Sequence, residues 1–179
     1  MSRPQSTRRV RTRVEIEAEL ASTLRNSLGR FVTGVAVLTF NVDEGPRGIT
    51  INSFTSVSLD PPLILASIAK SSRSHDLLAD GIPFTVNILG AEQEAVARHF
   101  SRRGQDLPVR WSVEASSPRL LGTLAHFECK PWRSYDAGDH TLVLGEVIDF
   151  AAREGDALGF FTSRFMPVAE ERLGHEDLF

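Results

Sequence analysis

Cysteine is almost absent from this chain of 179 residues, which contains a single one, Cys129. An intrachain disulfide is therefore excluded, and a chain without disulfides is typical of a reducing compartment. Cys129 alternates with Phe127, a pattern that predicts a small buried side chain in preference to a catalytic thiol.

Long apolar runs are also absent, since no stretch approaches the roughly 18 residues of a membrane-spanning helix. The N-terminus contains Arg3, Arg8, Arg9, Arg11 and Arg13, and no apolar stretch follows that could serve as a secretory signal. We therefore expect a cytoplasmic protein whose residues 1–14 form a disordered tail, with a docking or nucleic-acid-binding arm as the alternative for this tail. The net charge of −3 gives the folded body no reason to bind nucleic acid or an anionic membrane.

The remaining chain fits one domain, which we place at residues 15–168, followed by a C-terminal tail over 169–179. Residues 15–28 have helical spacing, with Ile16, Leu20, Leu24 and Leu28 at four-residue intervals. We expect this helix to cover part of a barrel. Further helices are predicted from about Ser74 and over residues 92–100.

Strand patterns predominate in the rest of the domain. They predict strands over residues 33–42, 49–52, 63–68, 84–89, 124–135 and 140–150. Turns are expected over residues 43–48 and 136–139, and a polar loop over 101–118. Many strands with hairpin turns, and no regular alternation of strands and helices, favour a mainly β fold with peripheral helices, in which the strands form an antiparallel barrel.

The segment 48–62, GITINSFTSVSLDPP, begins as a strand and then loses the alternation of a strand. From Ser53 onward small hydroxyl side chains predominate, interrupted by Phe54 and closed by two prolines. Small residues allow backbone N–H groups to approach the edge of a flat heterocycle, and Asn, Ser and Thr side chains add donors and acceptors. The alternative is an ordinary strand and turn rich in Ser and Thr, with Phe54 in the core.

A second polar segment, residues 71–74, places three serines and Arg73 at the start of the helix expected near Ser74. Free N–H groups and the positive end of a helix dipole attract an anion, and a guanidinium can bind a phosphate through two hydrogen bonds. The composition therefore fits a phosphate site. The alternative is that Ser74 only caps the helix and that Arg73 is a solvated charge.

Missing motifs disfavour several other chemistries. Val35 and Ala36 follow Gly34 where a phosphate-binding loop needs Lys and then Ser or Thr, and no Gly-x-Gly-x-x-Gly fingerprint follows a strand. The five histidines and the cysteine show no zinc-ligand spacing, and His126 and Glu128, which share a face, are expected to point to the surface. We therefore expect no metal. No Gly-x-Ser-x-Gly elbow indicates a hydrolase.

Three segments in order along the chain resemble the short-chain flavin reductase family: residues 28–35 (LGRFVTGV), residues 48–62, and residues 138–140 (GDH). The resemblance covers about residues 24–165. It implies the FMN-binding split β-barrel fold and a reductase component of a two-component flavin monooxygenase. Such a protein reduces FMN or FAD with NADH or NADPH and supplies the reduced flavin to its partner monooxygenase by diffusion. The resemblance also implies a homodimer with each flavin near the subunit boundary.

The resemblance assigns roles to the two polar segments. It implies that the polar edge of the flavin ring meets Thr50, Asn52, Ser53 and Thr55. It implies that the flavin phosphate is bound by Ser72, Arg73 and Ser74.

The resemblance also implies contacts for the nicotinamide. His140, which the alternation places on one face with Leu142, Leu144, Glu146 and Ile148, would position the nicotinamide. Hydride transfer needs no protein base, so His140 is not expected to act as an acid. Arg164 and Phe165 are candidate nicotinamide or flavin contacts, in a segment that departs from the family's Gly-Arg-Tyr pattern at Ser163 and Phe165.

Two other functions are compatible with the same pocket. One is a split-barrel oxidase of a phosphorylated amine. The other is a non-enzymatic flavin-binding protein or electron carrier, which would keep the ring pocket without productive nicotinamide binding.

Overall fold

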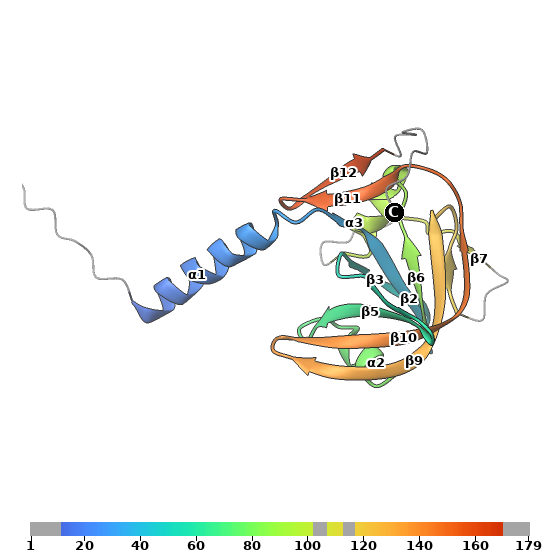
Figure 1. Cartoon of the computed structure of the whole chain (residues 1–179), viewed down its shortest axis with the longest axis horizontal. Helices are drawn as coiled ribbons and strands as arrows, with labels where there is room; N and C mark the ends of the chain where they lie inside the picture. Colours follow the sequence, from blue (N-terminus) through green and yellow to red (C-terminus); the bar gives the residue numbers. More distant parts are fainter. Residues whose placement is uncertain (1–11, 102–106, 113–116, 170–179) are drawn as a thin grey trace, which may run out of the picture.

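The computed structural model describes residues 12–101, 107–112 and 117–169, and most of the two predicted tails lies outside these residues. Seven strands form one antiparallel sheet in the order β3-β2-β6-β9-β10-β5-β4 (Figure 1). These strands are β2 (Ala36–Val42), β3 (Gly45–Ile51), β4 (Thr55–Leu59), β5 (Pro62–Ala69), β6 (Phe84–Ile88), β9 (Ala125–Ala137) and β10 (His140–Ala152). A smaller sheet has the order β1-β11-β12 and consists of β1 (Thr33–Gly34), β11 (Ala157–Phe161) and β12 (Arg164–Val168). The strands β7 (Trp111–Ser112) and β8 (Arg119–Leu120) form a separate antiparallel pair.

The large sheet curls around a core to which both of its halves contribute. Ile51 of β3 and Ile64 of β5 belong to the same buried cluster, although β3 is an edge strand with no ladder to β5 among the described strands. The barrel is therefore open between these strands, as the predicted split barrel requires. A second cluster, which includes Val37, Leu89 and Leu158, lies between the two sheets. Because β2 contributes to both clusters, it is buried on both faces.

Three backbone hydrogen bonds join the two sheets. The N–H of Val35 donates to Leu158 O at 3.0 Å, that of Leu158 to Leu89 O at 3.0 Å, and that of Leu89 to Val35 O at 3.0 Å. All three residues are at most 2% exposed. This joint, which we call the Val35 joint, explains why the strand predicted over residues 33–42 is divided, with β1 in one sheet and β2 in the other.

The short helices agree with the predictions made near Ser74 and over residues 92–100. They are α2 (His75–Ala79), the 3₁₀ helix η1 (Ala91–Gln93) and α3 (Glu94–His99). The helix predicted over residues 15–28 is also present, as α1 (Arg13–Leu28), and a capping box between Thr12 and Glu15 fixes its first turn.

The expectation that this first helix covers the barrel is wrong. Figure 1 shows α1 projecting away from the body of the molecule. Leu20, Leu24 and Leu28 are 68%, 56% and 67% exposed, so the apolar stripe that the sequence predicts has no partner within the described chain. Four-residue spacing indicates which side chains share a face, and it carries no information about what that face contacts.

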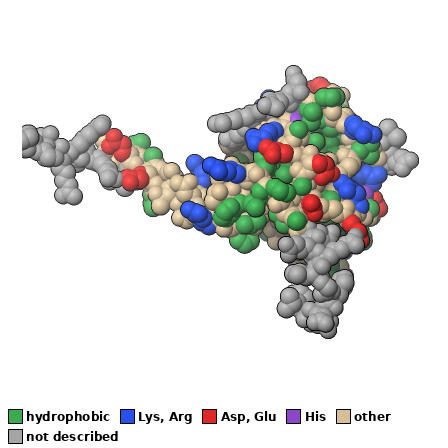
Figure 2. Space-filling model, turned by 90° about the horizontal axis from the view of Figure 1, so that it is seen from above, with side chains coloured by type: hydrophobic (Ala, Val, Ile, Leu, Met, Phe, Trp, Pro, Cys, Tyr) green, Lys and Arg blue, Asp and Glu red, His purple; other side chains and the backbone are tan. Residues whose placement is uncertain are grey.

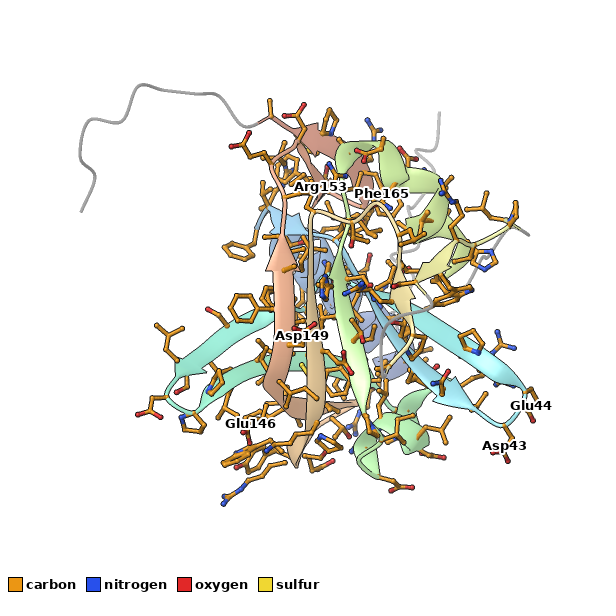
Figure 3. All side chains as sticks on the ribbon, turned by 90° about the vertical axis from the view of Figure 1, so that its right-hand side faces the viewer. Asp43, Glu44, Glu146, Asp149, Arg153 and Phe165 are labelled. Carbon is orange, nitrogen blue, oxygen red and sulfur yellow. The ribbon has the colours of Figure 1, made fainter. Side chains whose placement is uncertain are left out.

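Several boundaries also differ from the predictions. The turn predicted over residues 43–48 contains only Asp43 and Glu44, which Figure 3 shows at the tip of the β2–β3 hairpin. Gly45, with φ of 114°, begins β3 directly, and the edge position of β3 accommodates Pro46. The predicted loop over 101–118 includes β7, and residues 102–106 and 113–116 of that loop lie outside the described part. None of β4, β11 and β12 was predicted as a strand.

The two long strands β9 and β10 were predicted closely, and His140 shares a face with Leu142 and Leu144 as predicted, but the burial of two β9 side chains differs. On β10 the buried face carries Thr141 and Val143, so His140 lies on the other, partly exposed face. On β9, His126 and Glu128 are 9% and 7% exposed, so the expectation that they point to the surface is wrong. Arg119 reaches this face of β9, and its Nη1 lies 2.8 Å from His126 Nε2.

No helix in the described part of the chain combines the length and the apolar character needed to cross a membrane.

A buried amide connects three parts of the fold. Asn87 on β6 is fully buried, and its Nδ2 donates to Val37 O at 3.0 Å and to Thr39 Oγ1 at 2.9 Å. Its Oδ1 accepts from the N–H of Leu120 at 2.9 Å. Asn87 therefore fastens β8 to the interior of the barrel.

We expect Asn87→Leu to lower the free energy of unfolding by about 2 to 4 kcal/mol, because the Leu120 N–H would lose its acceptor in a buried site. Urea unfolding measures this change. The control is Asn41→Ala, on an exposed position of the neighbouring strand β2, where we expect a change below about 0.5 kcal/mol. Equal unfolding midpoints for Asn87→Leu and the wild type would contradict the role of the amide.

Candidate functional site

A pocket of about 1060 Å³ lies between the two sheets. One wall comes from the small sheet and carries Phe160 and Phe165, and the other comes from the ends of β3, β5 and β10 with the segment 71–74. Its lining residues are Arg25, Val35, Gly48, Ile49, Thr50, Ile51, Asn52, Ser53, Ser67, Ile68, Ala69, Ser71, Ser72, Arg73, Ser74, Phe100, Ser101, Asp139, His140, Phe160 and Phe165. Three segments far apart in the sequence, 48–53, 71–74 and 139–140, thus meet in one cavity.

The pocket contains most of the side chains predicted for the site. Those in its lining are Thr50, Asn52, Ser53, Ser72, Arg73, Ser74, His140 and Phe165. Thr55 and Arg164 are not in its lining. Arg164 precedes Phe165 on β12, and successive side chains of a strand point to opposite faces. Thr55 begins β4 beyond Phe54, whose ring packs on Phe127 in the core with centroids 5.7 Å apart, as the sequence analysis anticipated for Phe54.

The hydroxyl groups of the 48–53 segment are largely used within the protein. Thr50 Oγ1 donates to Ala97 O at 2.7 Å, and the Thr50 N–H donates to Phe100 O at 3.1 Å. Ser53 Oγ donates to Ser67 O and accepts from the Ser67 N–H, both at 3.0 Å. The side chain of Asn52 is exposed and has no hydrogen-bond partner among the described residues. Thr50 and Ser53 therefore fix the 48–53 segment, which we call the lip of the pocket, while the Asn52 side chain is available to a ligand.

Gly48 is required by packing at the same lip. A Cβ atom at this position would lie 2.7 Å from the ring of Phe100, which is closer than real Cβ atoms approach. Phe100, at the end of α3, can therefore line the pocket only because position 48 lacks a side chain. The sequence analysis noted Gly48 at the start of the 48–62 segment, but nothing in the sequence indicated that Phe100 packs against it.

The segment 71–74 is folded into a tight turn around Ser72. The Ser72 N–H donates to Ala69 O at 2.8 Å, and Ser72 Oγ accepts from the Ser74 N–H at 3.2 Å. Ser74 occupies the N-cap position of α2, as the alternative reading of this segment predicts, but its side chain makes no capping bond. The helix that follows has only five residues, so its dipole adds little. Arg73 is exposed and pairs with no carboxylate among the described residues.

His75 connects this turn to β10, a role that the sequence analysis did not assign. Its Nε2 lies 2.8 Å from Thr141 Oγ1, and its Nδ1 lies 2.7 Å from Asp76 Oδ1. Because a carboxylate only accepts, the Nδ1–H of His75 donates to Asp76, and the opposite ring nitrogen, Nε2, pairs with the Thr141 hydroxyl. The imidazole, whose side chain is 15% exposed, thus sets the position of the 71–74 turn relative to the strand that begins at His140.

His140 is paired with its neighbour. Its Nδ1 lies 2.6 Å from Asp139 Oδ1, and the hydrogen bond from His140, followed by the charge of His140, lowers the pKa of Asp139. The Asp139 carbonyl accepts from the Lys70 N–H at 2.9 Å, which fixes the turn at the entrance of β10. Nε2 of His140 has no partner among the described residues and is available to a ligand in the pocket.

The aromatic wall is held by the β11–β12 hairpin. Phe165 lies between Phe160, with ring centroids 5.4 Å apart, and the Arg98 guanidinium, 5.1 Å from the Phe165 centroid. Figure 3 shows Phe165 at the end of the molecule that carries α3. The turn of this hairpin contains Thr162 and Ser163 in the left-handed region, with φ of 46° and 64°. For a β-branched residue such as Thr162 this conformation is unusual, and surrounding contacts must maintain it.

The remaining reactive groups lie outside the pocket. Cys129 is buried and free, and burial, together with the nearby charge of Glu128, raises its pKa to about 12. This confirms the prediction of a buried side chain, and the thiol is a poor nucleophile at neutral pH. Within the described ranges, no three His, Cys, Asp or Glu side chains form a group that could hold a metal ion.

Comparisons with known proteins agree on one family. The flavin reductase like domain family matches residues 28–169 of the chain. The FMN reductase (NADH) of Agrobacterium fabrum is 44% identical over 149 residues, which cover 82% of this chain and 86% of that protein.

Two solved structures are similar in both sequence and fold. The NADH:FAD oxidoreductase of Streptomyces globisporus, solved in complex with NAD and FAD fragments, has a TM-score of 0.78 and 40% identity, covering 86% of this chain and 95% of its own. The styrene monooxygenase flavin reductase of Pseudomonas putida S12 has a TM-score of 0.75 and 39% identity, covering 80% of this chain and 95% of its own.

The region of the family match contains all but one of the residues that line the pocket, Arg25 being the exception. The open antiparallel barrel is the split-barrel fold of the structural neighbours. Sequence, fold and pocket therefore lead to the same result: the chain belongs to the flavin reductase like domain family.

Proposed function

We propose that the chain is an NADH-dependent flavin reductase that supplies reduced flavin to a separate monooxygenase. The relatives described above are named as NADH-dependent reductases of FMN or FAD, and one is the flavin reductase of a styrene monooxygenase. These names favour a reductase over the two alternatives, an electron carrier and an oxidase of a phosphorylated amine.

The observation that carries the proposal is the form of the pocket. Its volume of about 1060 Å³ slightly exceeds the range of about 300 to 1,000 Å³ for a pocket that holds one small ligand. A flavin and a nicotinamide can therefore occupy it together. Its aromatic wall and its polar lip suit a ring system with an apolar face and a polar edge.

The protein's part in this reaction is binding and orientation. Flavin and dihydronicotinamide supply the chemistry when bound, a hydride passing from nicotinamide C4 to flavin N5. Asn52 offers both a donor and an acceptor to the ring edge, and Thr50 Oγ1, which uses its hydrogen inside the protein, can still accept from a ring N–H. Ser53 retains one lone pair for the same purpose. Phe165 offers a stacking surface, while Thr55 and Arg164 are omitted because neither lines the pocket.

The 71–74 turn and His140 are proposed to bind the two substrates on the same wall. Arg73, with Ser72 and Ser74, binds the flavin phosphate. His140 positions the nicotinamide through Nε2, because Nδ1 is already engaged with Asp139.

We also propose a cytoplasmic homodimer. The exposed leucines of α1 form an apolar stripe that a second copy of the chain could cover, and the single free cysteine suits a reducing compartment. A monomeric mass in analytical ultracentrifugation would contradict the dimer.

The central test is steady-state oxidation of the nicotinamide cofactor with FMN, FAD and riboflavin in turn, followed as the loss of absorbance of NADH or NADPH. We expect NADH to be oxidised when flavin is added, and NADPH to be oxidised more slowly. Tight flavin binding without any oxidation of either cofactor would favour the electron carrier instead.

Arg73→Ala should weaken the binding of FMN at least about tenfold and leave the binding of riboflavin nearly unchanged, because only FMN has the phosphate that Arg73 would bind. Fluorescence titration of each flavin gives the two dissociation constants. Arg133→Ala, which removes an exposed arginine of β9 outside the pocket, is the matched control and should change neither constant. Equal losses for FMN and riboflavin would remove Arg73 from the phosphate site.

His140→Ala should raise KM for NADH severalfold while changing kcat little, since the proposed contact orients the donor and transfers no proton. His140→Gln retains a hydrogen-bonding side chain and should recover part of the loss. A KM for NADH equal to that of the wild type in both variants would show that His140 has no such role.

A further inference from the structure

We infer that Arg25, in the last turn of α1, binds the diphosphate of the nicotinamide dinucleotide. The inference rests on the proposed function and extends it. It gives NADH a second binding contact, at the diphosphate, in addition to the contact at the nicotinamide ring. Arg25 lies outside the segment that matches the family, yet it lines the pocket.

Two backbone hydrogen bonds fix the position of Arg25 against the aromatic wall. The N–H of Gly29 donates to Arg25 O at 2.9 Å, and Gly29 O in turn accepts from the N–H of Thr162 at 2.9 Å. Thr162 belongs to the left-handed turn between β11 and β12, the strands that carry Phe160 and Phe165. The end of α1 is therefore attached to the pocket wall, although the rest of the helix projects away from the body (Figure 1).

The charges in the lining favour two separate anions. Arg25 and Arg73 are the two guanidinium groups of the pocket lining, and the lining contains one carboxylate, Asp139, which is engaged by His140. Neither guanidinium has a carboxylate partner among the described residues. Figure 2 shows Lys and Arg side chains gathered where α1 meets the body.

The two guanidinium groups belong to different walls. Arg73 follows β5 of the large sheet, whereas Arg25 is attached to the hairpin of the small sheet. A flavin with its phosphate at the 71–74 turn leaves Arg25, on the opposite wall, to the diphosphate of the dinucleotide whose nicotinamide lies at His140. NADH has a diphosphate and no other strongly anionic group, so this diphosphate is the group that Arg25 would bind.

A purely structural role for Arg25 makes a different prediction. A cation in the last turn of a helix stabilises that helix through the helix dipole. That role would be retained by Arg25→Lys and would not affect the binding of NADH at all.

The test compares two hydride donors. NADH contains the diphosphate, whereas N-benzyl-1,4-dihydronicotinamide has the same reacting ring without any phosphate. We expect Arg25→Gln to raise KM for NADH about tenfold, and to raise the dissociation constant for NAD+ in equilibrium dialysis by a similar factor. We expect its KM for the benzyl compound and its dissociation constant for FMN to stay within about twofold of the wild type.

Two further variants complete the experiment. Arg25→Lys keeps the charge but loses the bidentate geometry, so we expect an intermediate KM for NADH. Arg30→Gln removes an exposed arginine near the same helix end that does not line the pocket, and we expect no change.

Three results would overturn the inference. The first is an unchanged KM for NADH in Arg25→Gln, together with an active wild type. The second is an equal loss for NADH and the benzyl compound, and the third is a loss confined to FMN or FAD binding. If the wild-type protein oxidises no NADH with any flavin, the proposed function itself fails, and the inference fails with it.

Discussion

The Val35 joint is the constraint on which the rest of the structure depends. Its three buried backbone hydrogen bonds connect Val35, Leu89 and Leu158, and their side chains lie together in the cluster between the two sheets. Breaking the joint would leave buried N–H and C=O groups without partners, at a cost of about 1 to 3 kcal/mol for each group. The joint also interrupts the strand that would otherwise run from Thr33 to Val42, and in this way it creates two sheets with a pocket between them.

The pocket built on this joint has a rigid interior and an accessible rim. Thr50 and Ser53 direct their hydroxyl hydrogens to carbonyl groups of the protein, and Gly48 admits the ring of Phe100. The groups that remain available lie at the rim, among them Asn52, Arg73 and Nε2 of His140. Exposed groups bind through interactions that water screens, so they stabilise a ligand only modestly. A reductase whose flavin must leave in reduced form needs this combination of fixed geometry and moderate affinity.

The sequence predicted those parts of the fold whose pattern is local. The long strands β9 and β10 alternate along their length, and α1 has both a capping box and regular apolar spacing. It did not predict β4, where Val57 and Leu59 alternate with serines over only four residues and both apolar side chains are exposed at the sheet edge. It also gave no indication that His126 and Glu128 are buried and that Arg119 contacts His126, since alternation along β9 does not show what packs over either face.

In the candidate site, too, the residues with a local sequence pattern were predictable and those brought in from distant segments were not. Residues in the 48–53 and 71–74 segments were predictable because they lie in short runs with unusual composition. Phe100, Phe160 and Arg25 come from three other elements, and only the folded chain brings them to the pocket. His75 was visible beside Arg73, but its role depends on Thr141, which is 66 residues away in the sequence.

The position of α1 connects the proposed dimer with the proposed binding of NADH. Leu24 and Leu28, which are 56% and 67% exposed, flank Arg25 on the last turn of the helix. A second subunit that covered these leucines would exclude water from one side of the helix end. Excluding water lowers the local dielectric constant, which strengthens the attraction between a guanidinium and a diphosphate. Dimer formation would then raise the affinity for NADH, because Leu24 and Leu28, which would contact the second subunit, lie at the same end of α1 as Arg25.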